Sequence, residues 1–382
     1  MTTTLFLQSE LNCPYQFYEK MLTDNPIYWD SINNHWAIYS YKGCKAILTG
    51  PSVQIPPVKT EGLNEYALSI TGKLARISNE AQHEIARHTV MLLFERMKSV
   101  SINEIVKGLI GKDQQELDWV NSVGMKLPIS VVLKSFGFKD NDCDFVLFKI
   151  KTLIKIMLPA KTPEQVTEIN GISTELYCRV ENHLLKADFY KPIINDLNEK
   201  YGVAKDDVLS FCISNLIGFF IQCYDAGRGI LSNTLLQLLN RGDWQIGNID
   251  KEHLQKHVVE TLRFNPPVQN TRRIATADII MENCRIKKGE NIFIVLASAN
   301  RDPMQFANPS MFDIQRSNNS EHLTFGAGGH TCPAKRLSVN LAIDSLFYLF
   351  TTYKSIKLLG KTIGYEPMVN LRLPKTIFIS IK

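Results

Sequence analysis

Between about residue 79 and residue 241, apolar side chains recur at the three- and four-residue spacing of amphipathic helices. The stripes cover 83–97, 102–109, 117–136, 144–158, 163–185 and 205–239. The last is far longer than the roughly 10–14 residues of an average helix. It contains Gly218, Gly227 and Gly229, which favour a local kink or the close approach of another segment. So much consecutive helix predicts a mainly α fold.

Strand-like segments are fewer and lie at the two ends of the chain. Alternating, β-branched or aromatic residues occur at 35–39, 273–275, 284–286, 292–295 and in pieces of 363–381. Residues 50–57 form a Gly/Pro break, and 58–73 have the irregular pattern of a covering loop. Further helices are expected at 250–263 and 333–353. We therefore expect a helical body with a small β region and one shared core, a single domain over 1–382.

Charge and hydropathy exclude several classes of protein. The net charge is +5, and lysine and arginine are spread along the chain, so no nucleic-acid groove is expected. Residues 1–14 lack a basic segment followed by an apolar one, so no signal peptide is expected. The apolar stretch 208–221 is too short to span a bilayer and is flanked by Asp206 and Asp207. We expect a cytoplasmic protein that does not enter a membrane.

Cys332 stands apart among eight cysteines, none of which forms a C-x-x-C pair. Gly326, Gly328 and Gly329 precede it and allow a tight turn with inward-pointing amides, and a helix is predicted directly after it. The positive N-terminal end of a helix stabilises a thiolate over a thiol. A thiolate so placed suits the axial position of haem iron. The alternative is a buried structural cysteine, as most of the others are expected to be.

The surrounding spacing favours the iron ligand. Phe325, Gly328 and Cys332 match F-x-x-G-x-x-x-C, and with them the chain resembles the cytochromes P-450. The likeness covers essentially the whole chain, which is identified as a member of that superfamily, of the short bacterial type. It implies the P-450 fold, a triangular helical body with a long distal helix and a proximal cysteine loop. It also implies haem b, with the iron ligated by the Cys332 thiolate.

Further motifs follow the order found in that family. Glu260 and Arg263 form E-x-x-R, and their i, i+3 spacing puts them on one helix face, where they can pair. In the family this pair locks the core near the thiolate loop, and residues 300–316 resemble its meander region. The resemblance also implies haem propionate contacts at His83, Arg87, Arg273 and His330. For His83 and Arg87 a solvated helix face is the alternative.

The distal helix departs from the family pattern. Where members carry A-G-x-[D/E]-T, this chain has Gln222-Cys223-Tyr224-Asp225-Ala226. The distal acid is kept as Asp225, while the threonine that helps to deliver protons is replaced by Ala226. General acid help is typically worth about 10²–10⁴ in rate, so its loss needs compensation. The resemblance implies that Asp225, Gln222 and Ala226 lie at the catalytic distal side.

Several reactions stay open. They are monooxygenation in which a substrate hydroxyl or Gln222 orders the proton-carrying water, oxidative coupling or desaturation with little oxygen insertion, peroxide-driven turnover, and ordinary hydroxylation with tolerated substitutions. A haem protein that only binds or senses a ligand is the alternative from another class.

The resemblance implies a small-to-medium apolar organic substrate, in secondary-metabolite biosynthesis. No flavin or iron–sulfur domain is attached, so a ferredoxin or flavodoxin with its reductase is the expected electron donor. Lys335 and Arg336 are basic candidates for docking it. Substrate-lining parts are expected at 58–75, 160–185, the distal helix, 268–271 and 367–369.

Overall fold

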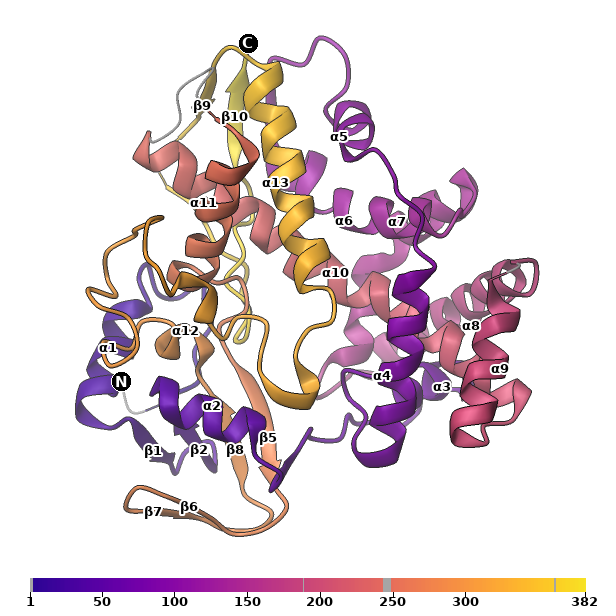
Figure 1. Ribbon diagram of the computed structural model, residues 1–382, viewed down its shortest axis with the longest axis horizontal. Helices are drawn as coiled ribbons and strands as arrows, with labels where there is room; N and C mark the ends of the chain where they lie inside the picture. The colour runs from indigo at the N-terminus through magenta and orange to yellow at the C-terminus, as the bar shows by residue number, and fades with distance from the viewer. Residues whose placement is uncertain (1–2, 188, 243–248, 361) are drawn as a thin grey trace. The chain divides into compact units, whose positions relative to one another are not determined.

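The computed structural model describes residues 3–187, 189–242, 249–360 and 362–382 (Figure 1). The chain forms two compact units. Unit 1 comprises Met1–Gln54, Ile102–Leu127 and Asp225–Lys382, and unit 2 comprises Ile55–Ser101 and Pro128–Tyr224. Each is described by itself, and the expectation of one domain over the whole chain stays a prediction.

Unit 2 is helical. Its helices are α3 (Glu65–Lys73), α4 (Glu80–Glu95), α6 (Leu127–Ser135, from Pro128 onward), α7 (Asp140–Leu153), the 3-10 turn η2 (Ile154–Met157), α8 (Pro163–Leu185), α9 (Tyr190–Tyr201) and the first part of α10 (Lys205–Arg241). The start of α8 follows from local chemistry, because the Thr162 side chain accepts from the N–H of Gln165 while the Gln165 side chain accepts from that of Thr162. Helix α8 packs against both α7 and α3.

Unit 1 holds the β structure. A five-stranded sheet has the order β1 (Ile27–Asp30), β2 (His35–Ile38), β8 (Asn291–Ile294), β5 (Thr271–Ala275) and β3 (Val53–Gln54). A three-stranded sheet has the order β4 (Glu116–Asp118), β10 (Phe378–Ile381) and β9 (Ile356–Leu358). A two-stranded hairpin is formed by β6 (Ile279–Met281) and β7 (Cys284–Ile286). Strands β2 and β8 are parallel and pair Trp36 with Ile292, which joins two segments far apart in the sequence in one sheet.

Helices and short turns complete unit 1. They are α1 (Tyr15–Asp24), α2 (Tyr41–Thr49), α5 (Ile102–Ile110), the π-helical turn η1 (Val120–Gly124), α11 (Lys251–Phe264), α12 (Leu296–Ala299), the 3-10 turns η3 (Asn319–Glu321) and η4 (Gly328–His330), and α13 (Lys335–Thr352). Helix α13 packs along α11, and the two lie side by side in Figure 1. A buried cluster under the sheet includes Ile38, Ile292, Ile294 and Phe306.

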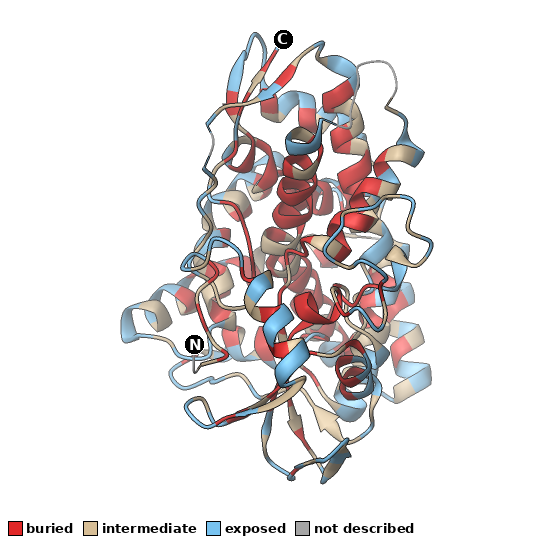
Figure 2. Cartoon of the chain, turned by 90° about the vertical axis from the view of Figure 1, so that its left-hand side faces the viewer, coloured by how far each residue is buried: buried red, intermediate tan, exposed pale blue. Residues whose placement is uncertain are grey.

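Helix α10 runs unbroken through Gly218 and Gly229. A Cβ at Gly218 would lie 2.4 Å from Cδ2 of Leu74, and one at Gly229 would lie 2.4 Å from Cβ of Pro267. Of the alternatives expected from the sequence, close approach is therefore the one observed. The helix is long and apolar enough to cross a membrane, but 72% of its apolar window is buried, as in a core helix. Figure 2 shows buried residues in red along the helices.

Three sequence expectations about elements were wrong. Residues 58–73 contain α3, which Asn64 caps by accepting from the N–H of Ala67 at 3.0 Å. The expected helix 117–136 is interrupted, because Leu117 pairs with Ile379 in the β4–β10 ladder and Pro128 has no N–H for a continuous helix. The last helix begins at Lys335 rather than 333, after a turn. Cys332 thus precedes α13 by three residues.

Candidate functional site

The segment 322–334 of unit 1 closes on itself through backbone hydrogen bonds. The N–H of Cys332 donates to the carbonyl of Phe325 at 2.9 Å, and the N–H of Gly326 donates to that of Leu323 at 2.8 Å. Inside this loop, the N–H of Thr331 donates to Gly328 at 3.0 Å. Phe325 and Cys332, seven positions apart, are therefore held together at the neck of one loop, as the F-x-x-G-x-x-x-C spacing requires.

Gly328 is required by geometry. Its φ is +70°, a region that L side chains rarely adopt, and a Cβ there would lie 2.5 Å from the carbonyl oxygen of Leu48 at the end of α2. Gly326 also has a positive φ, +71°. The loop can therefore approach α2 this closely only without a side chain at 328.

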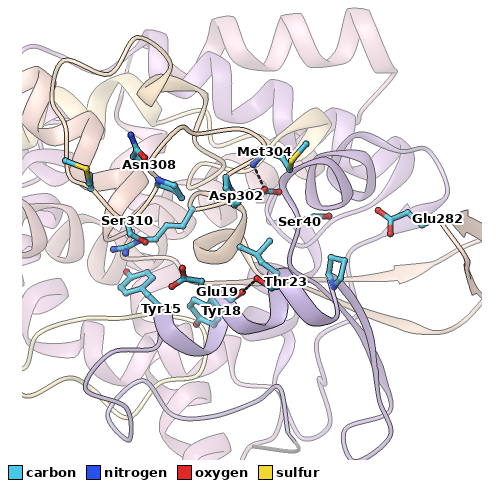
Figure 3. A pocket seen from close by; sticks show the side chains of 16 residues that line it. Tyr15, Tyr18, Glu19, Thr23, Ser40, Glu282, Asp302, Met304, Asn308 and Ser310 are labelled. Carbon is cyan, nitrogen blue, oxygen red and sulfur yellow. Dashed lines mark hydrogen bonds between the residues drawn. The ribbon is translucent and has the colours of Figure 1, made fainter.

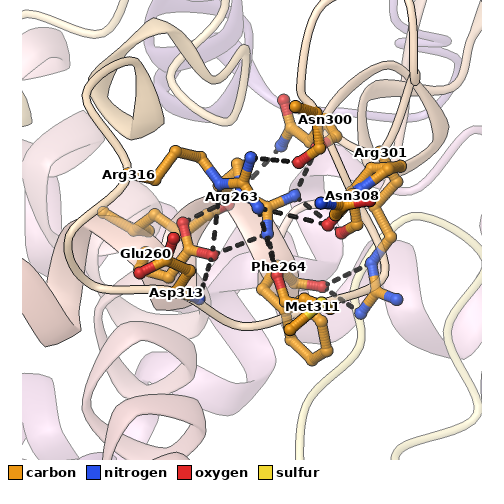
Figure 4. Close-up of polar contacts among 12 residues, drawn as sticks. Glu260, Arg263, Phe264, Asn300, Arg301, Asn308, Met311, Asp313 and Arg316 are labelled. Atoms are coloured by element: carbon orange, nitrogen blue, oxygen red, sulfur yellow. Dashed lines mark hydrogen bonds and ion pairs between the residues drawn. The ribbon is translucent and has the colours of Figure 1, made fainter.

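Glu260 and Arg263 form a fully buried ion pair on α11 (Figure 4). Arg263 donates to both carboxylate oxygens, with Nη2 at 2.6 Å from Oε1 and Nε at 2.8 Å from Oε2. Its remaining N–H groups donate to backbone carbonyls of the 300–311 segment, at 3.1 Å for Asn300, 2.9 Å for Pro309 and 3.0 Å for Met311. The E-x-x-R spacing thus makes the predicted pair, and its hydrogen bonds are satisfied.

This ion pair is connected to the cysteine loop. The Asn300 side chain accepts from the N–H of Leu323 at 2.7 Å and donates to the hydroxyl of Thr324 at 2.9 Å. Thr324 in turn donates to the carbonyl of Leu262, next to Arg263, at 2.6 Å. The start of the loop is therefore fixed to α11 through Asn300 and Thr324.

The polar groups of the distal segment are engaged within their own parts of α10. In unit 2, the Gln222 amide donates to the carbonyl of Gly218 at 3.1 Å, and the Cys223 thiol lies 3.6 Å from the carbonyl of Phe220. Burial raises the pKa of the Cys223 thiol well above its usual value. In unit 1, Asp225 pairs with Arg228 at 2.8 Å, and Ala226 contributes no polar group.

Comparison with known proteins agrees with this geometry. The family model described as "Cytochrome P450" matches residues 252–349, which include most of α11, the meander and the cysteine loop. The biotin biosynthesis cytochrome P-450 of Bacillus subtilis (strain 168) is 26% identical over 381 residues, with 95% of this chain and 94% of that protein covered. The chain belongs to the cytochrome P-450 family.

Other relatives and solved structures agree over nearly full length. Cytochrome P-450 119 of Sulfolobus acidocaldarius is 25% identical, with 86% of this chain and 90% of that protein covered. The crystal structure of P-450BioI in complex with an acyl carrier protein ligated to hexadec-9Z-enoic acid has a TM-score of 0.81 at 22% identity, with 97% and 98% covered. The Tepidiphilus thermophilus P-450 haem domain has a TM-score of 0.82 at 21% identity, with 98% and 95% covered. The expected P-450 fold is confirmed.

This P-450 is therefore a haem-thiolate oxidoreductase of the monooxygenase type, and haem is its cofactor. Arg273 tests whether unit 1 fits that group. It is only 5% exposed, donates to the carbonyl of Arg272 at 2.8 Å, and has no carboxylate ion-pair partner among the described residues. Burial lowers the pKa of its guanidinium to about 10. A buried cation of this kind fits a bound anion such as a haem propionate.

The other predicted cofactor contacts lie in two places. In unit 2, His83 and Arg87 are one turn apart on α4, and Nδ1 of His83 is 2.9 Å from the carbonyl of Ala75. In unit 1, His330 ends the short turn η4 inside the cysteine loop. His83 and Arg87 thus share one face of α4, as their spacing predicts, and His330 belongs to the cysteine loop.

A pocket of about 570 Å³ lies elsewhere in unit 1 (Figure 3). It opens between α1, with Tyr15, Tyr18 and Glu19, and the meander, with Met304 and Met311. None of the predicted site residues lines it, so it is separate from the cysteine loop.

Sequence reasoning missed Arg228 and Glu366. Arg228 bridges Asp225 and Glu366, with Nη2 2.8 Å from Asp225 and Nη1 3.2 Å from Glu366. The i, i+3 spacing of Asp225 and Arg228 was visible in the sequence as a signal for pairing. Glu366 lies 138 positions away and carries no local signal.

Proposed function

We propose that Cys332 is the iron ligand and that this P-450 oxidises a small-to-medium apolar organic molecule in secondary-metabolite biosynthesis. The supporting observation is the loop closed between Cys332 and Phe325 and anchored through Thr324 to α11. The N-terminal end of α13, which begins three residues after Cys332, supplies unpaired N–H groups and partial positive charge, and these favour a thiolate.

Haem, when bound, supplies the activation of dioxygen for oxidising the substrate. Arg273 and His330 are proposed to bind its propionates, and the resemblance to the family assigns the same role to His83 and Arg87. The buried cation at Arg273 supports this assignment, because a propionate would compensate its charge. Phe325 and Gly328 shape the loop around the ligand, and Glu260 with Arg263 holds it in place.

The distal residues favour protons that arrive with the substrate or its water. Ala226 has no hydroxyl, and the Gln222 amide already donates to the carbonyl of Gly218. Of the reactions left open by the sequence, substrate-assisted monooxygenation therefore has the strongest support. Asp225 is proposed as the distal acid that acts with that water. Coupling, desaturation and peroxide-driven turnover remain outcomes of the product analysis below.

The partners follow the same reasoning. Electrons are proposed to come from a ferredoxin or flavodoxin with its reductase, as the resemblance to the family implies. The protein is proposed to be cytoplasmic. One similar structure is a P-450 in complex with an acyl chain on a carrier protein, so carrier-bound acyl chains belong in the panel of candidate substrates.

A carbon-monoxide difference spectrum of the reduced protein tests the ligand assignment. The wild-type protein is expected to show the long-wavelength Soret band of the family, and Cys332→Ser is expected to lose it. Cys284→Ser is the matched control, because Cys284 is half-buried, as Cys332 is. A long-wavelength band that survives in Cys332→Ser, or a wild-type band well to the blue, contradicts Cys332 as the ligand.

A non-catalytic haem or ligand-binding protein is the second candidate, and Ala226 is the residue that favours it. Product analysis with redox partners, and separately with hydrogen peroxide alone, distinguishes the two. Consumption of a substrate by either route supports the enzyme, and the route identifies the chemistry. Ligand-induced spectral shifts without any product support the binding protein instead.

A further inference from the structure

Arg228 is shared by two carboxylates of unit 1. Its Nη2 lies 2.8 Å from Oδ1 of Asp225, one helical turn earlier on α10, and its Nη1 lies 3.2 Å from Oε1 of Glu366 on the C-terminal segment. The arginine side chain is 6% exposed, against 14% for Asp225 and 25% for Glu366. Since water screens buried charges poorly, these pairs are stronger than ordinary surface pairs.

The packing around Arg228 fixes where it can reach. Its Cβ is placed against η1, where a Cβ on Gly124 would lie 3.6 Å from it. One residue on, Gly229 brings α10 so close to Pro267 and Leu373 that a Cβ would lie 2.4 Å and 2.6 Å from their side chains. The backbone of α10 therefore has little room to move at this point.

The segment that carries Glu366 is equally fixed. The N–H of Glu366 donates to the carbonyl of Leu373 at 2.9 Å, and its own carbonyl accepts from Met368 at 2.8 Å. Residues 367–369, next to it, are the part of the C-terminal turn expected to line the substrate pocket. Glu366 therefore connects that turn to α10 through Arg228.

The turn η1, Val120–Gly124, contains no titratable residue. Arg372, on the same C-terminal segment as Glu366, points elsewhere, donating to the carbonyls of Gln8, Leu11 and Asn12. Two carboxylates thus share one guanidinium, and the cluster carries one net negative charge when all three groups are ionised.

We propose that Arg228 is a positioning residue for the carboxylate of Asp225, and that Glu366 sets the strength of this hold by sharing the same guanidinium. The proposal rests on the proposed function, in which Asp225 is the distal acid. Arg228 holds the Asp225 carboxylate turned along the helix through an ion pair that is largely buried. Any displacement of the 365–369 turn that withdraws Glu366 leaves Arg228 to Asp225 alone.

The pH dependence of reoxidation by air tests this without a redox partner or a known substrate. The cofactor-loaded protein is reduced chemically, and its reoxidation rate is followed from pH 5 to pH 9. Arg228→Gln is expected to move the half-maximal pH upward by about one unit or more, since an adjacent cation favours the ionised carboxylate. Glu366→Gln is expected to move the half-maximal pH downward. Arg228→Lys keeps the positive charge and is expected to retain most of the wild-type profile.

The double variant Asp225→Asn/Arg228→Gln decides whether Arg228 acts through Asp225. The proposal requires that Arg228→Gln cause no further shift once Asp225 is replaced. A shift of the same size in that background, or wild-type and Arg228→Gln profiles that coincide, overturns it. A wild-type profile that Asp225→Asn leaves unchanged overturns it as well.

Unfolding of the ferric protein gives a second readout that does not use turnover. The coupling between Asp225 and Arg228 is measured by a double-mutant cycle, first with Glu366 present and then in the Glu366→Gln background. The coupling, expressed in the unfolding equilibrium constant, is expected to increase at least threefold without Glu366. An unchanged or smaller coupling shows that Glu366 does not share Arg228.

Two further measurements keep the result interpretable. Should Arg228→Gln not fold, Glu366→Gln still gives the direction of the pH shift, with Arg228→Lys as the charge-conserving control, and an unshifted profile in Glu366→Gln counts against the proposal. The carbon-monoxide spectrum is recorded for each variant. If the wild-type protein lacks the long-wavelength Soret band, the proposed iron ligand is refuted. A normal spectrum with unshifted pH profiles refutes only the role of Arg228.

Discussion

The guanidinium of Arg263 and the carbonyl of Asn300 are joined by a 3.1 Å hydrogen bond, and the side chain of Asn300 holds the N–H of Leu323 at 2.7 Å. One asparagine therefore relays the position of a buried ion pair to the first residues of the cysteine loop. The consequence is that α11 and the loop should lose their order together.

Arg263→Met is expected to destabilise the protein strongly. It leaves the fully buried Glu260 carboxylate with only the N–H of Asp313, at 2.9 Å, and the more distant Arg316, at 3.7 Å, and removing one partner of a buried pair typically costs about 3–5 kcal/mol. Chemical unfolding of the cofactor-loaded protein measures the change. The control is Arg285→Gln, which removes a pair of similar length on the exposed β6–β7 hairpin and should leave the transition nearly unchanged. Equal effects of the two substitutions would contradict the importance of burial.

Gly328→Ala is expected to weaken the loop, while Gly329→Ala is its matched control. At 328 the positive φ alone costs a side chain about 1–3 kcal/mol, and the contact with the carbonyl of Leu48 adds to this. At 329 nothing lies within 4 Å of the added Cβ. Haem content per chain and the thermal midpoint should fall for the first variant and stay near wild type for the second. A Gly328→Ala protein with full haem content argues against a tight approach to α2.

The parts of the fold that sequence predicted well are those specified locally. Helix α8 has the expected limits because Thr162, Pro163 and Gln165 determine its start within four residues. Glu260 and Arg263 are likewise neighbours on one helix turn. Periodicity also indicated the long helix α10, since its apolar residues continue over its whole length.

The parts that sequence missed depend on distant partners. Strand β4 reads as helix on its own, and it forms a strand because Leu117 pairs with Ile379 at the other end of the chain. Glu366 reaches Arg228 through the fold, not through spacing. The start of α13 was wrong by two residues because a turn at 333–334 separates the cysteine from the helix. A single sequence contains no local signal for such contacts.

Arg273→Gln should have opposite effects on the two forms of the protein. In the cofactor-free protein it removes a buried cation that has no carboxylate partner among the described residues, so the fold should be unchanged or more stable. With haem bound it removes a counter-charge, so haem should transfer faster to a haem-scavenging protein. Arg272→Gln, at the adjacent exposed position of β5, is the control. Loss of stability in the cofactor-free form, with unchanged haem transfer, contradicts the propionate assignment.

His322, at the start of the cysteine loop, should make the stability depend on pH. Burial, assisted by Lys335 and Arg263, lowers the pKa of its imidazole to about 3, and the N–H of Thr324 donates to Nδ1 of the neutral ring at 3.2 Å. An unfolded chain protonates this histidine near pH 6.5, so between about pH 6.5 and pH 3 the unfolded state binds the extra proton. The stability that His322 contributes is therefore complete above pH 6.5 and declines as the pH falls through that window.

His322→Gln keeps a polar side chain, so it should flatten this dependence while costing some stability at pH 7. Unfolding free energies at pH 7, 6, 5 and 4 for the two proteins measure the difference in slope. His183→Gln is the comparison variant. Burial lowers the pKa of His183 as well, but this histidine belongs to unit 2 and not to the cysteine loop. Equal slopes in the wild-type and His322→Gln proteins would mean that the loop opens to water before the rest of the chain unfolds.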